Sequence, residues 1–451
     1  MIDTVGVEQR LARAVALRDE ARHAEAIDAL GEAGNDPRLA GAQAMLAYEA
    51  WLPATGLLER ALALAPGDRH FIRNLAGSLA ADGRRQAGEA VLVEALARDG
   101  EWVDGQVALA QLRTTAGDRA AERGFAEAVA QRPDSAPLWL GWFQWLAKAR
   151  RWDVAREVLD RAEEAVPGQR GLALSRLYLD AESGASRDPE LFSPGAALRD
   201  PGVDLGRVRH ALRLGQPEAV EAIATRHLAG PAGRMFWPYQ SLAWRLLGDH
   251  RADWLDRPDI AIAGHDLGYD AAGLAALART IRPLHVAVAP QIDQSVRGGT
   301  QTIRSLLLHH DPRIAELRRR IFGAVDDHVA ALPPPVAGHP WLGPPRQPRR
   351  LAGSWSVRLA GGGHHVAHVH PDGWFSSALH LVVPDGGGAG EGALVFGAPP
   401  AELGLDLAPT RSVAPVAGTL WLFPSTQWHG TSPFGAGERL SVAFDIAVPR
   451  G

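Results

Sequence analysis

Histidine and aspartate residues with the spacing of metal ligands occur near the C-terminal end of the 451-residue chain. His370 and Asp372 are two positions apart, and His429 follows the apolar run 420–423. Because alternate side chains of a strand share a face, a His-x-Asp pair can present two ligands together at a strand end. Two imidazoles and one carboxylate bind Fe(II) and leave its other positions open for further ligands. We therefore predict a metal site formed by His370, Asp372 and His429.

A second pair of residues, Arg439 and Ser441, follows the last of these histidines. On a strand, this Arg-x-Ser spacing places a guanidinium and a hydroxyl on one face. A guanidinium can bind a carboxylate through two parallel hydrogen bonds. A 2-oxo acid that chelates a metal at one end would need such a contact for the carboxylate at its other end.

These positions, together with three longer stretches, resemble the 2-oxoglutarate/Fe(II)-dependent oxygenase superfamily. The stretches are 368–380, 392–396 and 418–424, and they resemble a bacterial and phage branch whose members sometimes carry tetratricopeptide repeats. The resemblance covers about residues 285–450. It implies a double-stranded β-helix, or jelly roll, and an enzyme that uses Fe(II), 2-oxoglutarate and O2, usually to hydroxylate its substrate.

The same resemblance leaves two sets of metal ligands open. This branch carries a recurring His-x-His motif, which His368 and His370 match. One set is His370, Asp372 and His429, and the other is His368, His370 and His429. We favour the first set because an anionic ligand balances the charge of Fe(II). In that set, His368 would lie behind the ligands or face the substrate. Against this choice, the next predicted strand begins only a few residues after Asp372.

The predicted co-substrate site also includes His380. The resemblance implies that the distal carboxylate of 2-oxoglutarate pairs with Arg439 and Ser441. His380 stands where a tyrosine is common in this branch, and it would hydrogen-bond 2-oxoglutarate or serve as a buried structural histidine.

The second half of the chain has the pattern of a β-rich domain with flanking helices. Short apolar or alternating runs separated by glycine- and proline-rich turns predict strands at 355–359, 378–383, 393–396, 419–423 and 440–446. The run 284–288 is a weaker strand candidate, 297–301 reads as a loop, and the apolar spacing of 314–332 predicts a helix. His364 and His365 follow three glycines and are predicted to lie in a loop.

The first half of the chain repeats with a period typical of helix–turn–helix arrays. Turn residues Pro66, Gly100, Pro133 and Pro167 recur at intervals of about 34 residues, between segments rich in helix-forming residues. This resembles four or five tetratricopeptide repeats, which stack and usually bind a peptide or protein segment. Dimerisation of the chain, or a scaffold role, is the alternative. The aromatic group 139–145 reads as core between repeats rather than as a ligand platform.

The sequence therefore predicts an α+β multidomain chain. We expect helical repeats at 1–180, further helical pairs at 181–265, and the double-stranded β-helix at 266–451. The net charge of −5 argues against nucleic-acid binding, and the chain has no cysteine. No signal peptide or membrane span is predicted, so we expect a cytoplasmic protein.

The function predicted is a dioxygenase that hydroxylates a peptide or protein side chain recruited by the repeats. A small-molecule hydroxylase with scaffolding repeats, a non-enzymatic metal-binding adaptor, and a metalloenzyme that does not use 2-oxoglutarate are the alternatives. Arg439 and Ser441 favour the first reading over the last two, because only a co-substrate with a carboxylate needs them.

Overall fold

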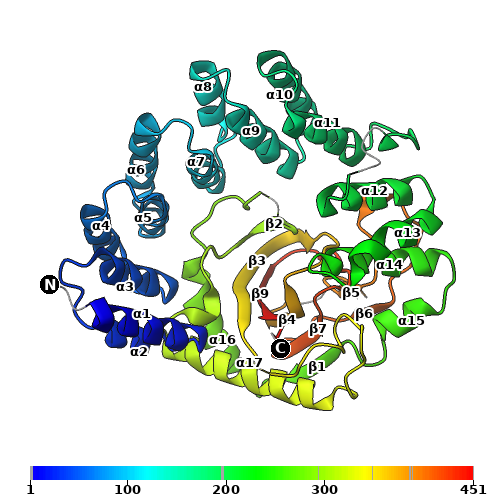
Figure 1. Cartoon of the computed structure of the whole chain (residues 1–451). Coiled ribbons are helices and arrows are strands. Elements are labelled where there is room, and N and C mark those ends of the chain that lie inside the picture. The colour runs from blue at the N-terminus through cyan, green and yellow to red at the C-terminus, as the bar shows by residue number, and fades with distance from the viewer. Residues whose placement is uncertain are drawn as a thin grey trace. The chain divides into compact units, whose positions relative to one another are not determined.

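The computed structural model describes residues 4–193, 198–292, 294–347, 349–384, 388 and 390–449 (Figure 1). The chain forms two compact units, each built from segments that are not contiguous in sequence. The first comprises residues 1–142, 283–292 and 302–319, and the second comprises 143–282, 293–301 and 320–451. The domain divisions expected after residues 180 and 265 do not coincide with these limits and stay predictions.

The N-terminal part of the chain is a series of short helices, as its repeat period predicts. The helices are α1 (Thr4–Asp19), α2 (His23–Leu30), α3 (Pro37–Glu49), α4 (Thr55–Leu64), α5 (Arg69–Ala81), α6 (Arg85–Arg98), α7 (Val103–Thr115), α8 (Arg123–Gln131), α9 (Ala136–Lys148), α10 (Trp152–Ala165) and α11 (Arg170–Glu182). Pro66, Gly100, Pro133 and Pro167 all lie in turns between helices. The all-helical repeat region is therefore confirmed.

Local sequence explains where individual helices begin. The Asp68 carboxylate accepts hydrogen bonds from the N–H groups of His70 and Phe71, at 2.8 and 3.1 Å, and so caps α5. Asp36 caps α3 in the same way. The aromatic side chains at 139, 142, 143 and 145 are buried, which agrees with the interpretation as core.

Stability of the repeats should depend on buried leucines such as Leu92 of α6, which is fully buried among Ile72, Leu96 and Trp102. We expect Leu92→Ala to lower the free energy of unfolding by about 2–5 kcal/mol, because it removes apolar contacts and leaves a cavity. The neighbouring Val93 is 46% exposed, so Val93→Ala should change the free energy of unfolding by no more than about 0.5 kcal/mol. Urea denaturation of the two variants measures both values, and equal losses would contradict the packing described.

Further helices and the strands follow in the second half of the chain. The helices are α12 (Pro201–Arg213), α13 (Pro217–Leu228), α14 (Gly233–Leu246), α15 (Arg251–Asp256), α16 (Ala271–Ile281) and α17 (Pro312–Ala331). The strands are β1 (Ala263–Asp266), β2 (Val296–Gln301), β3 (Leu351–His365), β4 (Gly373–Val382), β5 (Leu394–Phe396), β6 (Arg411–Val413), β7 (Thr419–Pro424), β8 (His429–Thr431) and β9 (Glu438–Ala447). Among the described residues, no helix is both long and apolar enough to cross a bilayer.

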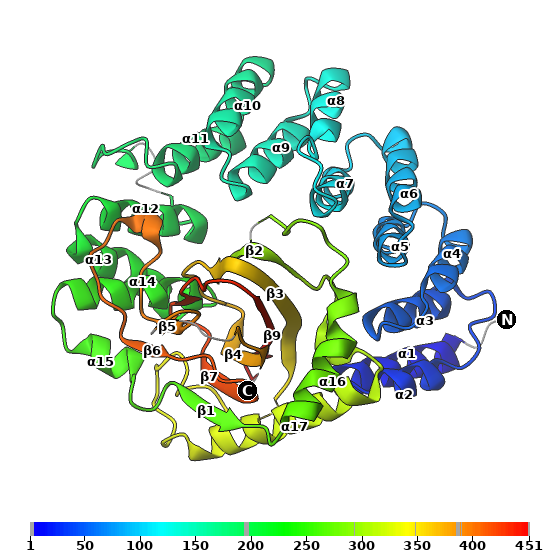
Figure 2. The ribbon, with the colours of Figure 1, turned by 180° about the vertical axis from the view of Figure 1, so that it is seen from behind.

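The strands form two antiparallel sheets (Figure 2). The larger sheet has the order β1-β7-β4-β9-β3-β2, and the smaller one has the order β6-β5-β8. Phe396 of the small sheet packs on Phe423 of the large sheet, with ring centroids 5.0 Å apart. His328 of α17 packs on Phe375 of β4 at 4.9 Å. This is a double-stranded β-helix with flanking helices, as predicted.

Three local predictions in this region are wrong. The run 284–288 forms no strand, and 297–301 lies in β2 instead of a loop. His364 and His365 are the last residues of β3, where they pair with Arg297 and Val296 of β2. The glycines 361–363 do not end the strand, because the pairing with β2 supplies hydrogen bonds that local propensity does not reflect.

A buried histidine makes the stability of the second unit depend on pH. His339 donates from Nε2 to the carbonyl of Trp254 at 2.9 Å, and its Nδ1 accepts from the N–H of Leu342 at 3.2 Å. The Nδ1 contact requires the neutral ring, because a protonated Nδ1 cannot accept. Burial lowers the pKa of His339 to about 4, from 6.5. Because the unfolded chain binds the proton first, stability is complete above pH 6.5 and is lost as the pH falls towards 4.

The size of this loss of stability follows from the shift in the pKa of His339. We expect His339 to lower the free energy of unfolding by about 3 kcal/mol between pH 7 and pH 4. Denaturation of the wild type and of His339→Gln between pH 7 and pH 4 measures it. The variant should be less stable at pH 7 and should lose less stability on acidification. Parallel pH profiles for the two proteins would contradict this expectation.

Candidate metal centre

Three histidines from two segments come together at one end of the sheets. His368 and His370 lie between β3 and β4, and His429 is the first residue of β8. The backbones of His368 and His429 exchange two hydrogen bonds, at 2.9 and 3.0 Å, and the N–H of His370 donates to the carbonyl of Ser425 at 2.9 Å. One ligand atom from each ring lies within 4.8 Å of the other two.

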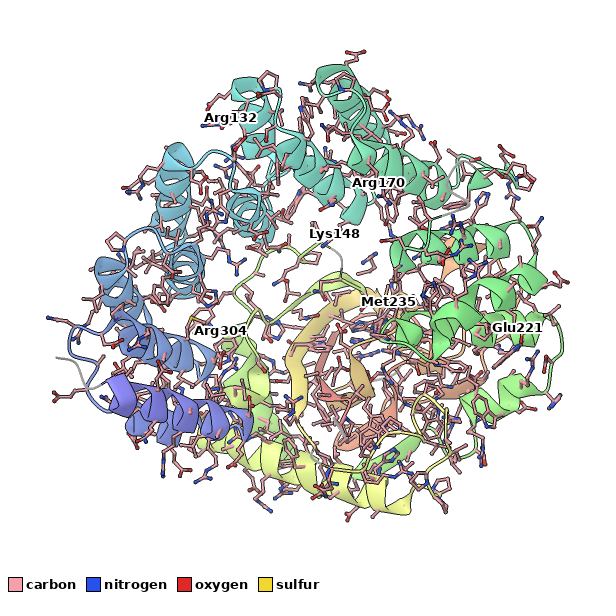
Figure 3. The ribbon with its side chains drawn as sticks, viewed as in Figure 1. Arg132, Lys148, Arg170, Glu221, Met235 and Arg304 are labelled. Carbon is pink, nitrogen blue, oxygen red and sulfur yellow. The ribbon has the colours of Figure 1, made fainter. Side chains whose placement is uncertain are left out.

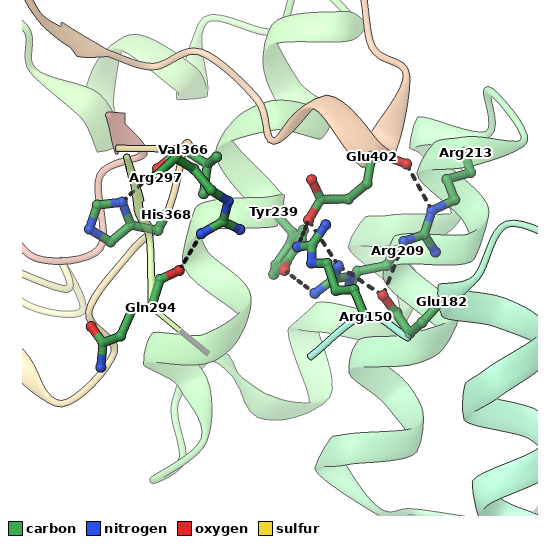
Figure 4. Close-up of polar contacts among 10 residues, drawn as sticks. All are labelled: Arg150, Glu182, Arg209, Arg213, Tyr239, Gln294, Arg297, Val366, His368 and Glu402. Carbon is green, nitrogen blue, oxygen red and sulfur yellow. Dashed lines mark hydrogen bonds and ion pairs between the residues drawn. The ribbon is translucent and has the colours of Figure 1, made fainter. Parts of the chain in front are cut away.

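Hydrogen bonds fix the orientation of all three rings. Nδ1 of His368 contacts the carbonyl of Val366 at 2.8 Å (Figure 4), and Nδ1 of His429 contacts the carbonyl of Gln427 at 2.9 Å. Nδ1 of His370 lies 2.9 Å from Oδ2 of Asp445. Since these oxygens accept, each Nδ1 carries the proton, and each Nε2 keeps its lone pair for a metal ion.

The protein also favours the uncharged form of two of these rings, those of His368 and His429. Burial, reinforced by the neighbouring His370, lowers the pKa of His368 to about 3. Burial lowers the pKa of His429 well below its usual value. A neutral imidazole is the form that binds a metal ion, so the site is ready for a cation at neutral pH.

Asp372 lies apart from this cluster. It is exposed on the turn between His370 and β4, and the N–H of Gly373 closes that turn on the carbonyl of His370 at 3.1 Å. The expectation that positions 370 and 372 share a face required an extended chain, and the turn removes that alternation. Of the predicted ligands, the structure brings together His368, His370 and His429, without Asp372.

Asp445 is a residue of this site that the sequence interpretation missed. Its Oδ1 accepts a hydrogen bond of 2.6 Å from the hydroxyl of Ser376, while Oδ2 faces His370. Asp445 is on β9 with Arg439 and Ser441, at even spacing, so the alternation along that strand was a signal that could have found it.

We expect Asp445→Asn to weaken metal binding by about 10- to 100-fold, because a carboxylate behind a ligating imidazole orients the ring and raises its basicity. Asp445→Ala should weaken it at least as much. Anaerobic Fe(II) titration of the two variants measures this. Wild-type affinity in Asp445→Asn would show that the negative charge on this residue has no part in metal binding.

Arg439 is a buried cation without a counter-ion among the described residues. Its side chain is 2% exposed, Nη1 donates to the carbonyl of Gly392 at 2.9 Å, and Nε is buried with no hydrogen-bond partner. Burial lowers the pKa of Arg439 to about 10, so the guanidinium remains charged at neutral pH. An unpaired buried charge is costly, so this environment fits an anionic ligand that completes it.

Ser441 and His380 lie beside each other on neighbouring strands. The two residues pair across β9 and β4, and Nδ1 of His380 lies 3.1 Å from the hydroxyl of Ser441. Nε2 of His380 is buried with no partner. Burial and the charge of Arg439 lower the pKa of His380 to about 3, so its ring is neutral. Three polar side chains can thus contact a carboxylate here.

The comparison with protein families agrees with this chemistry. Residues 353–445 match the family model described as "Putative 2OG-Fe(II) oxygenase". This segment is a 2-oxoglutarate/Fe(II) oxygenase domain. The family implies Fe(II) and 2-oxoglutarate, the predicted cofactors. The three converging imidazoles fit the metal ion, and Arg439, which has a buried Nε without a hydrogen-bond partner, fits the anionic co-substrate.

Solved structures similar to the chain include two hydroxylases and one repeat protein. The chain is 20% identical to a Pseudomonas putida prolyl-4-hydroxylase, with 43% of this chain and 95% of that chain covered and a TM-score of 0.29. The chain is 12% identical to the viral collagen prolyl hydroxylase of Paramecium Bursaria Chlorella virus-1, with 42% of this chain and 97% of that chain covered and a TM-score of 0.29. It is also 12% identical to a tetratricopeptide repeat protein from Parabacteroides merdae, with 55% of this chain and 89% of that chain covered and a TM-score of 0.33. No protein among those with curated descriptions gives a significant sequence match.

Proposed function

We propose that the oxygenase domain binds Fe(II) through His368, His370 and His429, and that the chain hydroxylates a peptide or protein side chain. The observation that supports this ligand set is the convergence of the three rings, each with its Nδ1 already engaged. The predicted set with Asp372 would require the turn at 370–373 to open. Asp445, behind His370, would supply the negative charge that a directly bound carboxylate provides in the other set.

The residues around the proposed iron site have distinct roles. Arg439, Ser441 and His380 would bind the distal carboxylate of 2-oxoglutarate. Bound Fe(II) would supply the chemistry that couples O2 and 2-oxoglutarate to oxidation of the substrate. The buried walls of the site exclude water and orient the reactants.

The substrate class rests on the helical repeats. Arrays of this kind usually bind an extended peptide or protein segment, because stacked helix pairs present a long surface. A small-molecule hydroxylase in which the repeats serve as a scaffold is the second candidate. A metal-binding adaptor without catalysis is disfavoured by Arg439, whose buried charge has no structural partner among the described side chains.

The activity of the site is tested by anaerobic titration of the protein with Fe(II) and then 2-oxoglutarate. We expect a visible metal-to-ligand charge-transfer band that appears only when both are present. Succinate should then form when O2 is admitted. The absence of the band at saturating 2-oxoglutarate would refute the proposed co-substrate site.

The substrate class needs a separate measurement. We expect succinate formation to rise in the presence of a matching peptide from a peptide library, and that peptide to gain the mass of one oxygen atom. A control without 2-oxoglutarate should leave the peptide unchanged. Stimulation by small metabolites and by no peptide would favour the small-molecule candidate.

A further inference from the structure

Helix α14 contacts both segments that carry the histidine cluster, although it lies more than a hundred residues before the segment that matches the oxygenase family. Its residues 236–244 are all buried, and Met235, labelled in Figure 3, packs in the same apolar cluster as Val369 and Trp428. Two groups of contacts join the helix to the site.

The first group comes from Arg234, at the start of the helix. Its Nε donates to the carbonyl of Pro371 at 2.9 Å, its Nη1 donates to that of Pro340 at 2.9 Å, and its Nη2 donates to that of Gly373. Pro371 and Gly373 belong to the turn that directly follows His370. The planar guanidinium, with five donors, can contact several carbonyls at once, which a lysine cannot do in the same geometry.

Among the described residues, no carboxylate forms an ion pair with Arg234. Burial lowers the pKa of Arg234 to about 10, with the more distant charge of Asp372 opposing this. The side chain therefore remains a cation at neutral pH, and it donates to three backbone carbonyls. Burying a cation in this way is costly unless the geometry is well satisfied, so the position is suited to fixing a turn.

The second group of contacts reaches the other ligand segment. The indole N–H of Trp428 donates to the carbonyl of Pro238 at 3.0 Å, and the ring of Tyr239 packs edge-on against Trp428 at 5.3 Å. Trp428 directly precedes His429. The hydroxyl of Tyr239 is contacted by Arg209 of α12 at 3.3 Å, as Figure 4 shows, so the helix is itself held by its neighbours.

We propose that α14 is a structural part of the iron site, and that Arg234 is a positioning residue that fixes His370 while Pro238 and Tyr239 fix His429 through Trp428. This inference rests on the proposed function, because it takes the histidine cluster to be the iron site. Residues that orient metal ligands commonly change metal affinity by about 10- to 100-fold when they are replaced.

The test is the affinity of the full-length protein for Co(II), read from its visible absorption under anaerobic conditions as a stand-in for Fe(II). Arg234→Met is expected to raise the Kd by about 10- to 100-fold and to alter the Co(II) spectrum. Arg234→Lys keeps the positive charge but loses the planar set of guanidinium donors, so it should recover only part of the affinity. Trp428→Phe, which removes one hydrogen bond and keeps the ring, should also weaken binding.

The matched control is Arg320→Met. Arg320 of α17 also binds two backbone carbonyls, those of Leu267 and Gly268, each at 2.8 Å, and both of these residues lie outside the two ligand segments. Its replacement should leave the Co(II) affinity and spectrum unchanged. Thermal denaturation of the apo-proteins separates loss of folding from loss of metal binding.

Two results would overturn the inference. One is wild-type Co(II) affinity in Arg234→Lys and Trp428→Phe, and the other is an equal loss in Arg320→Met. Failure of the wild-type protein to bind Co(II), with His429→Ala indistinguishable from it, would instead refute the proposed iron site itself.

Discussion

Replacement of His368, His370 or His429 by alanine is expected to abolish Fe(II) binding, whereas Asp372→Ala should retain it. Each histidine contributes one of the three nitrogens that face one another, and no other described residue joins that cluster. Because residues behind a ligand already change affinity by about 10- to 100-fold, loss of a ligand should cost about 100-fold or more. Asp372 is exposed on the turn and its removal takes nothing from the cluster.

The measurement is anaerobic Fe(II) titration of the four variants beside the wild type. His364→Ala is the control for the loss of a histidine, because His364 lies on β3 outside the cluster and its Nδ1 contacts the carbonyl of Gly362 at 3.2 Å. Loss of iron in Asp372→Ala together with retention in His368→Ala would restore the ligand set with a carboxylate.

The second large effect is expected for 2-oxoglutarate in Arg439→Met. Removing one partner of a buried charge pair costs about 2–5 kcal/mol, and each 1.4 kcal/mol is a tenfold change in affinity. The 2-oxoglutarate concentration that gives half of the charge-transfer band should therefore rise about 30-fold or more, while Fe(II) affinity changes little. Since no carboxylate of the described chain pairs with Arg439, the apo-protein should not lose stability through a broken ion pair.

Arg358→Met is the control for this experiment. Arg358 lies on the neighbouring strand β3, opposite Leu440, and its half-exposed guanidinium pairs with Glu438 at 2.6 Å. Its replacement removes an arginine from the same sheet without reaching the pocket, so 2-oxoglutarate binding should not change. Equal affinities in Arg439→Met and the wild type would place the distal carboxylate elsewhere.

Two kinds of feature could be predicted from the sequence because they depend on local order. The repeat period of the first half fixes where turns fall, and short alternating runs fix which segments become strands. The pairing of Arg439 with Ser441 on one face follows from the period of a strand alone. His370 and His429 were recognisable as candidate ligands because the Arg439 and Ser441 pair follows them closely in the sequence.

Only the tertiary structure decided which residues meet at the metal centre. Asp372 was expected beside His370 on the assumption of an extended chain, but the turn at 370–373 breaks the alternation, and the pairing of His368 with His429 brings in the other histidine. Strand β2 forms because β3 offers it hydrogen bonds across more than fifty residues of sequence. Arg234 reaches the site from a distant helix, and no local pattern marks it. Such contacts depend on register and on the packing of remote segments, which the period of a single segment does not contain.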